Sequence, residues 1–204
     1  MQEEKNIFPV FDRLTPRDQK ERCLKQRSIA VWFCGLSGAG KTTIAVELER
    51  MLFRNGFICQ LLDADNVRTS INKDLGFSLK DREENIRRIA ELNKLFVHSG
   101  MIILNCFISP TKSIRHIARD IIGNNDFVEV FLNAPFEVCR KRDTKGLYKK
   151  ASDGKVADFT GISSPFELPD NPDLEVKTDI LNIEESTIKV FDFILPKIRF
   201  SATP

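Results

Sequence analysis

Short runs of consecutive apolar residues alternate along this chain with longer segments in which apolar residues recur every three or four positions. Apolar runs bounded by turn residues are typical of strands buried in a parallel sheet, and the periodic segments are typical of helices that cover it. The runs that we interpret as strands are residues 28–34, 57–63, 101–108 and 126–132, and residues 174–179 are a further short strand. The alternation predicts an α/β fold of three layers, with a mainly parallel central sheet flanked by helices.

The predicted helices share an apolar face or clear end signals. They are residues 15–26, 41–54, 81–98, 111–122, 135–143 and 182–198. Thr15 can cap the first helix, with Pro16 in its first turn. In the third, Ile86, Ile89, Leu92 or Asn93, and Phe96 recur at helical spacing and predict a buried face.

Residues 144–173 differ in character from the rest of the chain. They are rich in Lys, Gly, Ser, Asp and Pro and have little apolar periodicity. A long irregular segment within a compact domain is usually a functional lid or a disordered insert, and we expect a mobile lid. With no repeat and no linker, the chain reads as one domain over residues 1–204.

Composition narrows the classes of function. The chain has 204 residues, of which 42% are hydrophobic and 29% charged, and its formal net charge is only +2. Bulk charge therefore gives no reason to expect a nucleic-acid or membrane partner, and no apolar run is long enough to span a bilayer. The first residues are polar and lack the pattern of a secretory signal peptide, and the five cysteines show no CxxC pair. We expect buried thiols, with a regulatory disulfide as the lesser alternative, and a cytoplasmic location.

The stretch GLSGAGKTT matches the phosphate-binding pattern G-x-x-x-x-G-K-[ST] and lies between a predicted strand and a predicted helix, as that motif requires. Its glycines allow backbone N–H groups to surround phosphate oxygens, the lysine reaches the β and γ phosphates, and the threonine hydroxyl ligates Mg²⁺. The candidate ATP-binding residues are therefore Gly35, Leu36, Ser37, Gly38, Ala39, Gly40, Lys41, Thr42 and Thr43. The motif predicts a P-loop NTPase fold that binds ATP with Mg²⁺.

The P-loop alone leaves an ATPase, a GTPase switch and a small-molecule kinase as alternatives. A GTPase normally carries the guanine-reading pattern N-K-x-D. The nearest stretch here is Asn72-Lys73-Asp74-Leu75, whose fourth residue is wrong. This mismatch counts against a GTPase.

Two carboxylates follow the second predicted strand. Asp63 and Asp65 lie at the carboxyl edge of the sheet, where ligands bind in open α/β folds. Phosphoryl transfer to an alcohol needs a carboxylate near the attacking hydroxyl, both to accept its proton and to help hold Mg²⁺. We expect the two carboxylates to lie in an extended segment, with one facing the reacting centre and the other supporting the site or the metal. The candidate catalytic residues are Asp65, Lys41 and Asp63, with Thr42 and Asp65 as magnesium ligands, and spacing alone leaves the division of roles between the aspartates open.

Several further stretches together resemble the adenylylsulfate kinase family over about residues 15–195. They read LLDADNVR, NKDLGFSLKDREENIRRIAEL, FISP, FVEVFLNAPFEVCRKRD, KGLYKKA and FTGISSPFELPDNPDLEV. The resemblance implies transfer of the ATP γ-phosphoryl group to the 3′-hydroxyl of adenosine 5′-phosphosulfate (adenylyl sulfate), as in sulfate assimilation. It also suggests a homodimer and functional coupling to a sulfate adenylyltransferase.

The resemblance supplies roles for residues whose chemistry fits such an acceptor. Arginine offers planar paired donors to anions, and flat apolar rings suit adenine. From the sequence alone, each phenylalanine in a polar loop fits the core and a ligand site equally well. The residues that match the family's substrate contacts are Arg68, Phe77, Arg82, Asn85, Ile108, Ser109, Pro110, Lys149 and Phe159. Arg142 matches an ATP contact.

The chain departs from the usual family pattern at three places. Ala64 stands where many members have Gly, Thr69-Ser70 replaces His-Gly, and Thr111-Lys112 replaces an aromatic-Arg pair. None alters the P-loop, so activity is still expected. The alternatives left open are a related kinase with another hydroxyl acceptor and a nucleotide-binding regulatory module.

Overall fold

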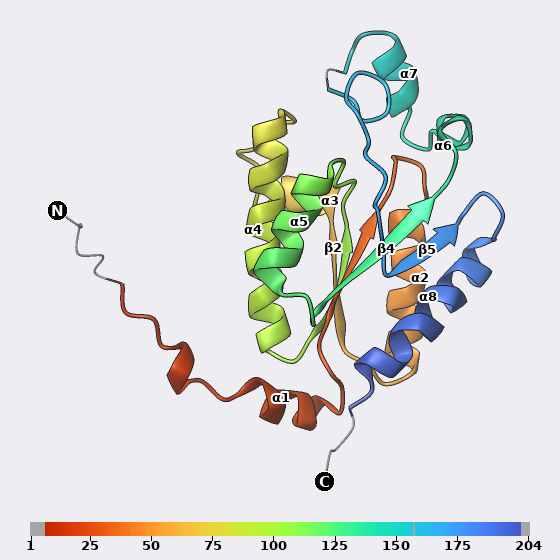
Figure 1. Ribbon diagram of the computed structural model, residues 1–204. Helices are drawn as coiled ribbons and strands as arrows, with labels where there is room; N and C mark the ends of the chain where they lie inside the picture. Colours follow the sequence, from red (N-terminus) through yellow and green to blue (C-terminus); the bar gives the residue numbers. More distant parts are fainter. Residues whose placement is uncertain (1–6, 157, 201–204) are drawn as a thin grey trace.

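Five parallel strands form the centre of the molecule in a computed structural model, which describes residues 7–156 and 158–200 (Figure 1). The strands are β1 (Ala30–Cys34), β2 (Cys59–Asp63), β3 (Ile102–Cys106), β4 (Phe127–Asn133) and β5 (Leu174–Lys177). They pair in the order β2-β3-β1-β4-β5, and every pair is parallel. The predicted α/β class and all five predicted strands are confirmed; β4 is shifted by one residue from its prediction, and the other four strands are shorter than predicted. The predicted single domain over residues 1–204 includes residues outside the described ranges and stays a prediction.

Helices cover both faces of this sheet. The helices are α1 (Arg17–Leu24), α2 (Lys41–Arg54), α3 (Ala64–Arg68), α4 (Leu79–His98), α5 (Lys112–Ile122), α6 (Phe136–Arg142), α7 (Leu147–Ser152) and α8 (Ile183–Ile198). A 3-10 turn, Phe11–Arg13, precedes them. The helices α2 and α8 pack together on one face and α4 and α5 on the other (Figure 1).

The central strand β1 explains this three-layer arrangement. All five of its residues are buried. Val31 and Phe33 join the core cluster that includes α2 and α8, whereas Trp32 and Cys34 join the cluster that includes α4 and α5. Since successive side chains of a strand point to opposite faces, a continuous apolar run buries both faces.

Three local predictions are wrong. The residue before α1 is Pro16, with no side-chain cap, so Thr15 does not cap that helix. Asp63 and Asp65 do not share an extended segment, because the five-residue helix α3 begins directly after β2. The predicted irregular segment 144–173 contains the helix α7, and its residue 157 lies outside the described residues.

The predicted buried face of α4 is largely confirmed. Ile86, Ile89 and Asn93 are buried, while Phe96 is only partly so and Val97 is buried beside it. The amide of Asn93 exchanges two 2.8 Å hydrogen bonds with that of Asn105 on β3. A polar side chain is tolerated in this interior because its partner satisfies it.

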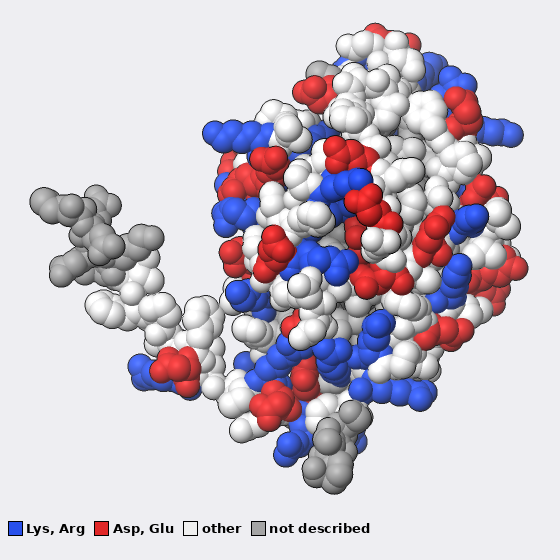
Figure 2. Space-filling view, in the orientation of Figure 1, with Lys and Arg blue, Asp and Glu red and all other residues white. Residues whose placement is uncertain are grey.

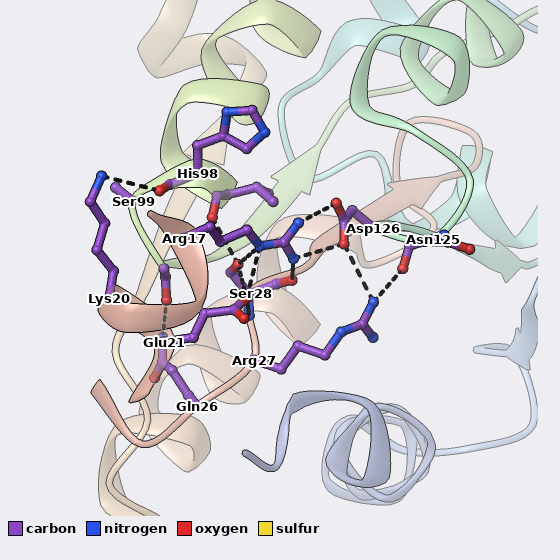
Figure 3. Close-up of polar contacts among 12 residues, drawn as sticks. Arg17, Lys20, Glu21, Gln26, Arg27, Ser28, His98, Ser99, Asn125 and Asp126 are labelled. Carbon is purple, nitrogen blue, oxygen red and sulfur yellow. Dashed lines mark hydrogen bonds and ion pairs between the residues drawn. The ribbon is translucent and has the colours of Figure 1, made fainter. Parts of the chain in front are cut away.

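The opposite end of the sheet from the carboxyl edge is held by an arginine of α1 (Figure 3). Arg17 donates through its two Nη atoms to both carboxylate oxygens of Asp126, at 2.5 and 2.8 Å, and through Nε to Glu21 and to Ser28. Arg27 adds a 3.4 Å contact to Asp126. Paired hydrogen bonds of this kind are stronger than a single exposed ion pair. The network fastens α1 to the start of β4.

Asp126→Asn should therefore lower the free energy of unfolding by about 1–3 kcal/mol, the usual range for a lost charged hydrogen-bond partner. Urea unfolding would measure the loss, with the exposed Asp12→Asn as control. Turnover per folded molecule should not change, because Asp126 precedes β4 at the amino edge of the sheet. An unfolding midpoint equal to that of the control would contradict the anchoring role.

The surface in the orientation of Figure 1 carries both signs of charge. Lys and Arg side chains are interspersed with Asp and Glu over this face, without a broad area of one sign (Figure 2). In the described part of the chain, no helix is long and apolar enough to cross a bilayer.

Candidate active site

Two adjoining cavities lie at the carboxyl edge of the sheet. The first has a volume of about 900 Å³ and the second about 350 Å³. Five residues line both of them: Ser37, Ala64, Asp65, Ile108 and Leu147. The cavities therefore meet along one shared wall, where groups bound in each would face one another.

The P-loop forms the floor of the first cavity. Gly35, Gly38 and Gly40 all have positive φ angles, of 144°, 79° and 96°. A Cβ atom at Gly35 would lie 2.6 Å from the carbonyl oxygen of Leu132, and one at Gly38 would lie 2.8 Å from that of Cys139. Gly35 and Gly38 are therefore required to be glycine for two reasons: their φ angles are positive, and a side chain would clash with a backbone carbonyl group.

Most of the predicted ATP-binding residues line this first cavity. They are Ser37, Gly38, Gly40, Lys41, Thr42, Thr43 and Arg142. Gly35, Leu36 and Ala39 do not line it. Arg142 donates to the carbonyl oxygens of Gly38, at 3.2 Å, and Thr178, at 2.5 Å. Because α2 begins at Lys41, its free N–H groups and its dipole favour an anion in this cavity.

Lys41 is the buried cation of the site. Its ammonium group donates to the carbonyl oxygens of Gly35 and Leu36, both at 2.8 Å. Burial disfavours the charged form and lowers the pKa of Lys41 to about 8 from its ordinary 10.5. A phosphate placed beside it would favour the charged form again.

This shift gives a testable pH dependence. Near pH 8 about half of the Lys41 side chains are charged in the free protein, so binding ATP should take up roughly half a proton. Affinity for ATP should fall as the pH rises above 8, because the free lysine loses its charge. Calorimetry at pH 8 in buffers of different ionisation enthalpy would measure the uptake. Uptake that persists unchanged in Lys41→Met would contradict this origin.

Asp63 lies beside the P-loop hydroxyl. Its Oδ2 accepts a 2.7 Å hydrogen bond from Thr42, and its Oδ1 accepts the backbone N–H of Asp65 at 3.0 Å. The carboxylate is thus both the N-cap of α3 and a buried neighbour of Thr42, with only 8% of the residue exposed. No group of three or more His, Cys, Asp or Glu side chains in residues 7–156 and 158–200 could hold a metal by itself. A hydroxyl and a carboxylate oxygen nevertheless suit Mg²⁺ that takes its other ligands from phosphates and water.

Asp65 differs from Asp63 in position and exposure. It lies in the first turn of α3, its side chain is 69% exposed, and it forms an ion pair with Lys145. It lines both cavities, whereas Asp63 lines only the first. The two aspartates are therefore distinguished by their surroundings, which spacing alone did not reveal.

The second cavity brings together most of the predicted substrate residues. They are Arg68, Phe77, Arg82, Asn85, Ile108, Ser109, Pro110 and Phe159. The guanidinium of Arg68 lies 4.5 Å from the ring centroid of Phe77, and that of Arg82 lies 5.8 Å from it. Two cations and an aromatic ring at one cavity wall suit a flat anionic ligand.

The two predicted phenylalanines have different environments. Phe77 is 59% exposed, in the loop before α4. Phe159 is buried, packs edge-on against Tyr148 with 5.0 Å between ring centroids, and belongs to a core cluster. Phe159 therefore serves the core and the cavity wall together.

Lys149 is the predicted substrate residue that the structure does not bring to the site. It is exposed on α7 and lines neither cavity. Lys145, two residues before α7, lines the first cavity instead. Sequence reasoning also left out the cavity residues that follow β5. They are Thr178, Leu181, Asn182, Ile183, Glu184 and Ser186. Their position after a predicted strand, at the carboxyl edge, was the available signal.

Comparisons with known proteins identify the family of the chain. The model of the family described as adenylylsulphate kinase matches residues 27–177. An adenylyl-sulfate kinase of Bacteroides thetaiotaomicron is 53% identical over 98% of this chain and 99% of its own length, and one of Clostridium kluyveri is 50% identical over 91% and 93%. The APS kinase CysC of Mycobacterium tuberculosis, solved in complex with AMPPNP and APS, superposes with a TM-score of 0.80 and 43% identity, covering 83% of this chain and 98% of that one. The chain belongs to the adenylylsulphate kinase family.

Proposed function

We propose that this protein transfers the γ-phosphoryl group of ATP to the 3′-hydroxyl of adenosine 5′-phosphosulfate, releasing ADP and 3′-phosphoadenosine 5′-phosphosulfate. The observation that carries the proposal is Asp65 on the wall shared by a P-loop cavity and a second, arginine-lined cavity. A carboxylate at that junction is placed to accept the proton of an attacking hydroxyl. The relatives of about half identity over nearly the whole chain carry the same activity in their names.

The first cavity is the proposed donor cavity, for ATP. Lys41 and the N–H groups of the P-loop would neutralise the transferred phosphoryl group, and Arg142 would add a second cation. Thr42 and Asp63 are the proposed holders of Mg²⁺, in place of the predicted pair Thr42 and Asp65, because the carboxylate of Asp63 is the one that contacts the Thr42 hydroxyl. When bound, Mg²⁺ would offset charge on the phosphate oxygens.

The second cavity is the proposed acceptor cavity, for adenylyl sulfate. Arg68 and Arg82 would bind its phosphosulfate group, since a guanidinium offers paired donors to an oxyanion. Phe77 and Phe159 would contact the adenine ring, and Asn85 would add an amide. Backbone groups of residues 108–110 are further candidates for hydrogen bonds to the base.

The reaction needs one proton transfer from the acceptor. The 3′-oxygen forms a bond to the γ-phosphorus, the bond between that phosphorus and the bridging β-γ oxygen breaks, and the hydroxyl proton passes to the carboxylate of Asp65. The ammonium of Lys145 forms an ion pair with this carboxylate, and the pairing raises the pKa of Lys145.

A coupled assay of ADP release tests this proposal. With ATP and Mg²⁺, adenylyl sulfate should accelerate ADP release well beyond the rate seen with ATP alone, and AMP or sugar alcohols at equal concentration should not. Acceleration by a different hydroxyl compound would favour a related kinase. Nucleotide binding with no acceptor-dependent ADP would favour a regulatory module.

Three further expectations belong to the same proposal. We propose a homodimer, which light scattering would test, and exposed Phe8 and Phe11 near the amino terminus offer apolar surface for such an assembly. The five cysteines are free, which suits a cytoplasmic location. Functional coupling to a sulfate adenylyltransferase would supply the acceptor.

A further inference from the structure

Arg115 is a buried arginine of α5 that no motif singled out. Only 3% of the residue is exposed. Its Nε lies 3.0 Å from a carboxylate oxygen of Glu129, on the strand β4. Its Nη1 donates to the carbonyl oxygen of Ser109 at 2.7 Å, and its Nη2 donates to that of Glu167 at 2.9 Å. One guanidinium thus joins the sheet to two separate loops.

The first of these loops is the wall of the acceptor cavity. Ser109 has a φ angle of 46°, which is unfavourable for a residue other than glycine and persists only where its surroundings enforce it. Two contacts do so here: the carbonyl bond from Arg115, and a 2.9 Å hydrogen bond from the indole of Trp32 to the Ser109 hydroxyl. The strained turn presents Ile108, Ser109 and Pro110 to the cavity.

The second loop is bonded to the first and continues from another part of the cavity wall. Glu167 donates its backbone N–H to the carbonyl oxygen of Pro110 at 2.8 Å, and its carboxylate accepts the backbone N–H of Lys112 at 2.7 Å. The chain that leads to Glu167 carries Asp158, Phe159 and Thr160, which line the acceptor cavity together with residues 108–110. Arg115 therefore holds the two walls in register with one another.

We propose that Arg115 is a positioning residue that sets the width and shape of the acceptor cavity, without touching either substrate. This inference rests on the proposed function, since it assigns the cavity to adenylyl sulfate. Glu129 neutralises the buried charge, and Arg119 and Asp173 complete the cluster around it. Lysine cannot replace Arg115, because it lacks the planar fork that addresses a carboxylate and two carbonyls together.

The main test is Arg115→Lys, which keeps a cation beside Glu129 and loses the fork. The KM for adenylyl sulfate should rise roughly tenfold or more, as two net hydrogen bonds would allow, while the KM for ATP stays within about twofold. Calorimetric affinity for adenylyl sulfate in the presence of ADP should fall in parallel. The matched control is Arg119→Lys on the same helix, which pairs with Glu129 and Asp173 and should leave both KM values unchanged.

Glu129→Gln separates positioning from simple stability. This variant keeps both carbonyl contacts of Arg115 but weakens the buried pair, so its unfolding temperature should fall while its acceptor KM stays near that of the unmodified protein. If Arg115→Lys does not fold, the double variant Arg115→Met with Glu129→Leu removes both charges together and should show the same rise in acceptor KM.

The outcomes distinguish this inference from the proposed function. An unmodified protein without turnover of adenylyl sulfate would overturn the proposed function itself. Normal turnover, with an acceptor KM that Arg115→Lys leaves unchanged or that Glu129→Gln raises equally, would overturn only the positioning role.

Discussion

Asp65→Asn is expected to lower kcat by roughly 10²–10⁴-fold, the usual range for loss of a general base, with much smaller changes in both KM values. Asparagine keeps the shape of the side chain but cannot accept the hydroxyl proton. Because Asp65 is exposed and its only ion pair in the described residues is with Lys145, the variant should fold normally. Steady-state ADP release with saturating ATP and adenylyl sulfate would measure the effect.

Two comparisons sharpen this result. Asp74→Asn changes another exposed carboxylate, one paired with Arg88 and outside both cavities, and should leave kcat unchanged. Asp63→Asn changes the carboxylate beside Thr42 and should raise the Mg²⁺ concentration needed for half-maximal activity. If Asp65→Asn kept kcat within a few-fold while Asp63→Asn abolished it, the base would be Asp63, and our division of roles would be wrong.

Lys41→Met should lower kcat/KM for ATP on the order of 10²–10³-fold, the loss typical of removing one donor aimed at transition-state charge. Methionine is nearly as long and is apolar, so it fills the buried space without the charge that burial disfavours. The unfolding temperature should therefore change little, although the carbonyl groups of Gly35 and Leu36 lose a donor.

The control for this variant is Lys94→Met, which removes an exposed ammonium group of α4. Its kinetics should match those of the unmodified protein. A Lys41→Met protein that is folded, by its unfolding temperature, and still turns over at more than about a tenth of the normal rate would contradict the role of Lys41 in charge stabilisation.

The features predicted best from the sequence are those that depend on local pattern. The helix α2 has the predicted bounds, because a P-loop begins it and Asn55-Gly56 follows its end. The strands β1, β3 and β4 were recognisable because both of their faces are buried, which leaves few polar positions to break the apolar run. Many residues of the two cavities are motif residues, because the motifs follow parallel strands and the carboxyl ends of those strands meet at one edge of the sheet.

The features that were missed depend on tertiary contacts. The helix α3 has five residues and no apolar period of its own, and only the cap from Asp63 marks its start. Lys145 lines a cavity and Lys149 does not, because α7 begins between them. The sequence of this segment did not indicate a helix. Arg115 was not distinguishable from a surface arginine of an amphipathic helix. Its partners Glu129 and Glu167 are distant in sequence, and its bond to Ser109 depends on the fold of a loop.

The most direct test of the central claim is the identity of the product. Incubation with ATP, Mg²⁺ and adenylyl sulfate should give one ADP for each acceptor consumed, and ³¹P NMR should show a new phosphomonoester coupled to the 3′ proton of the ribose. Asp65→Asn should form the same product far more slowly. A phosphate found only as free inorganic phosphate, or on any atom other than the 3′ oxygen, would contradict the account.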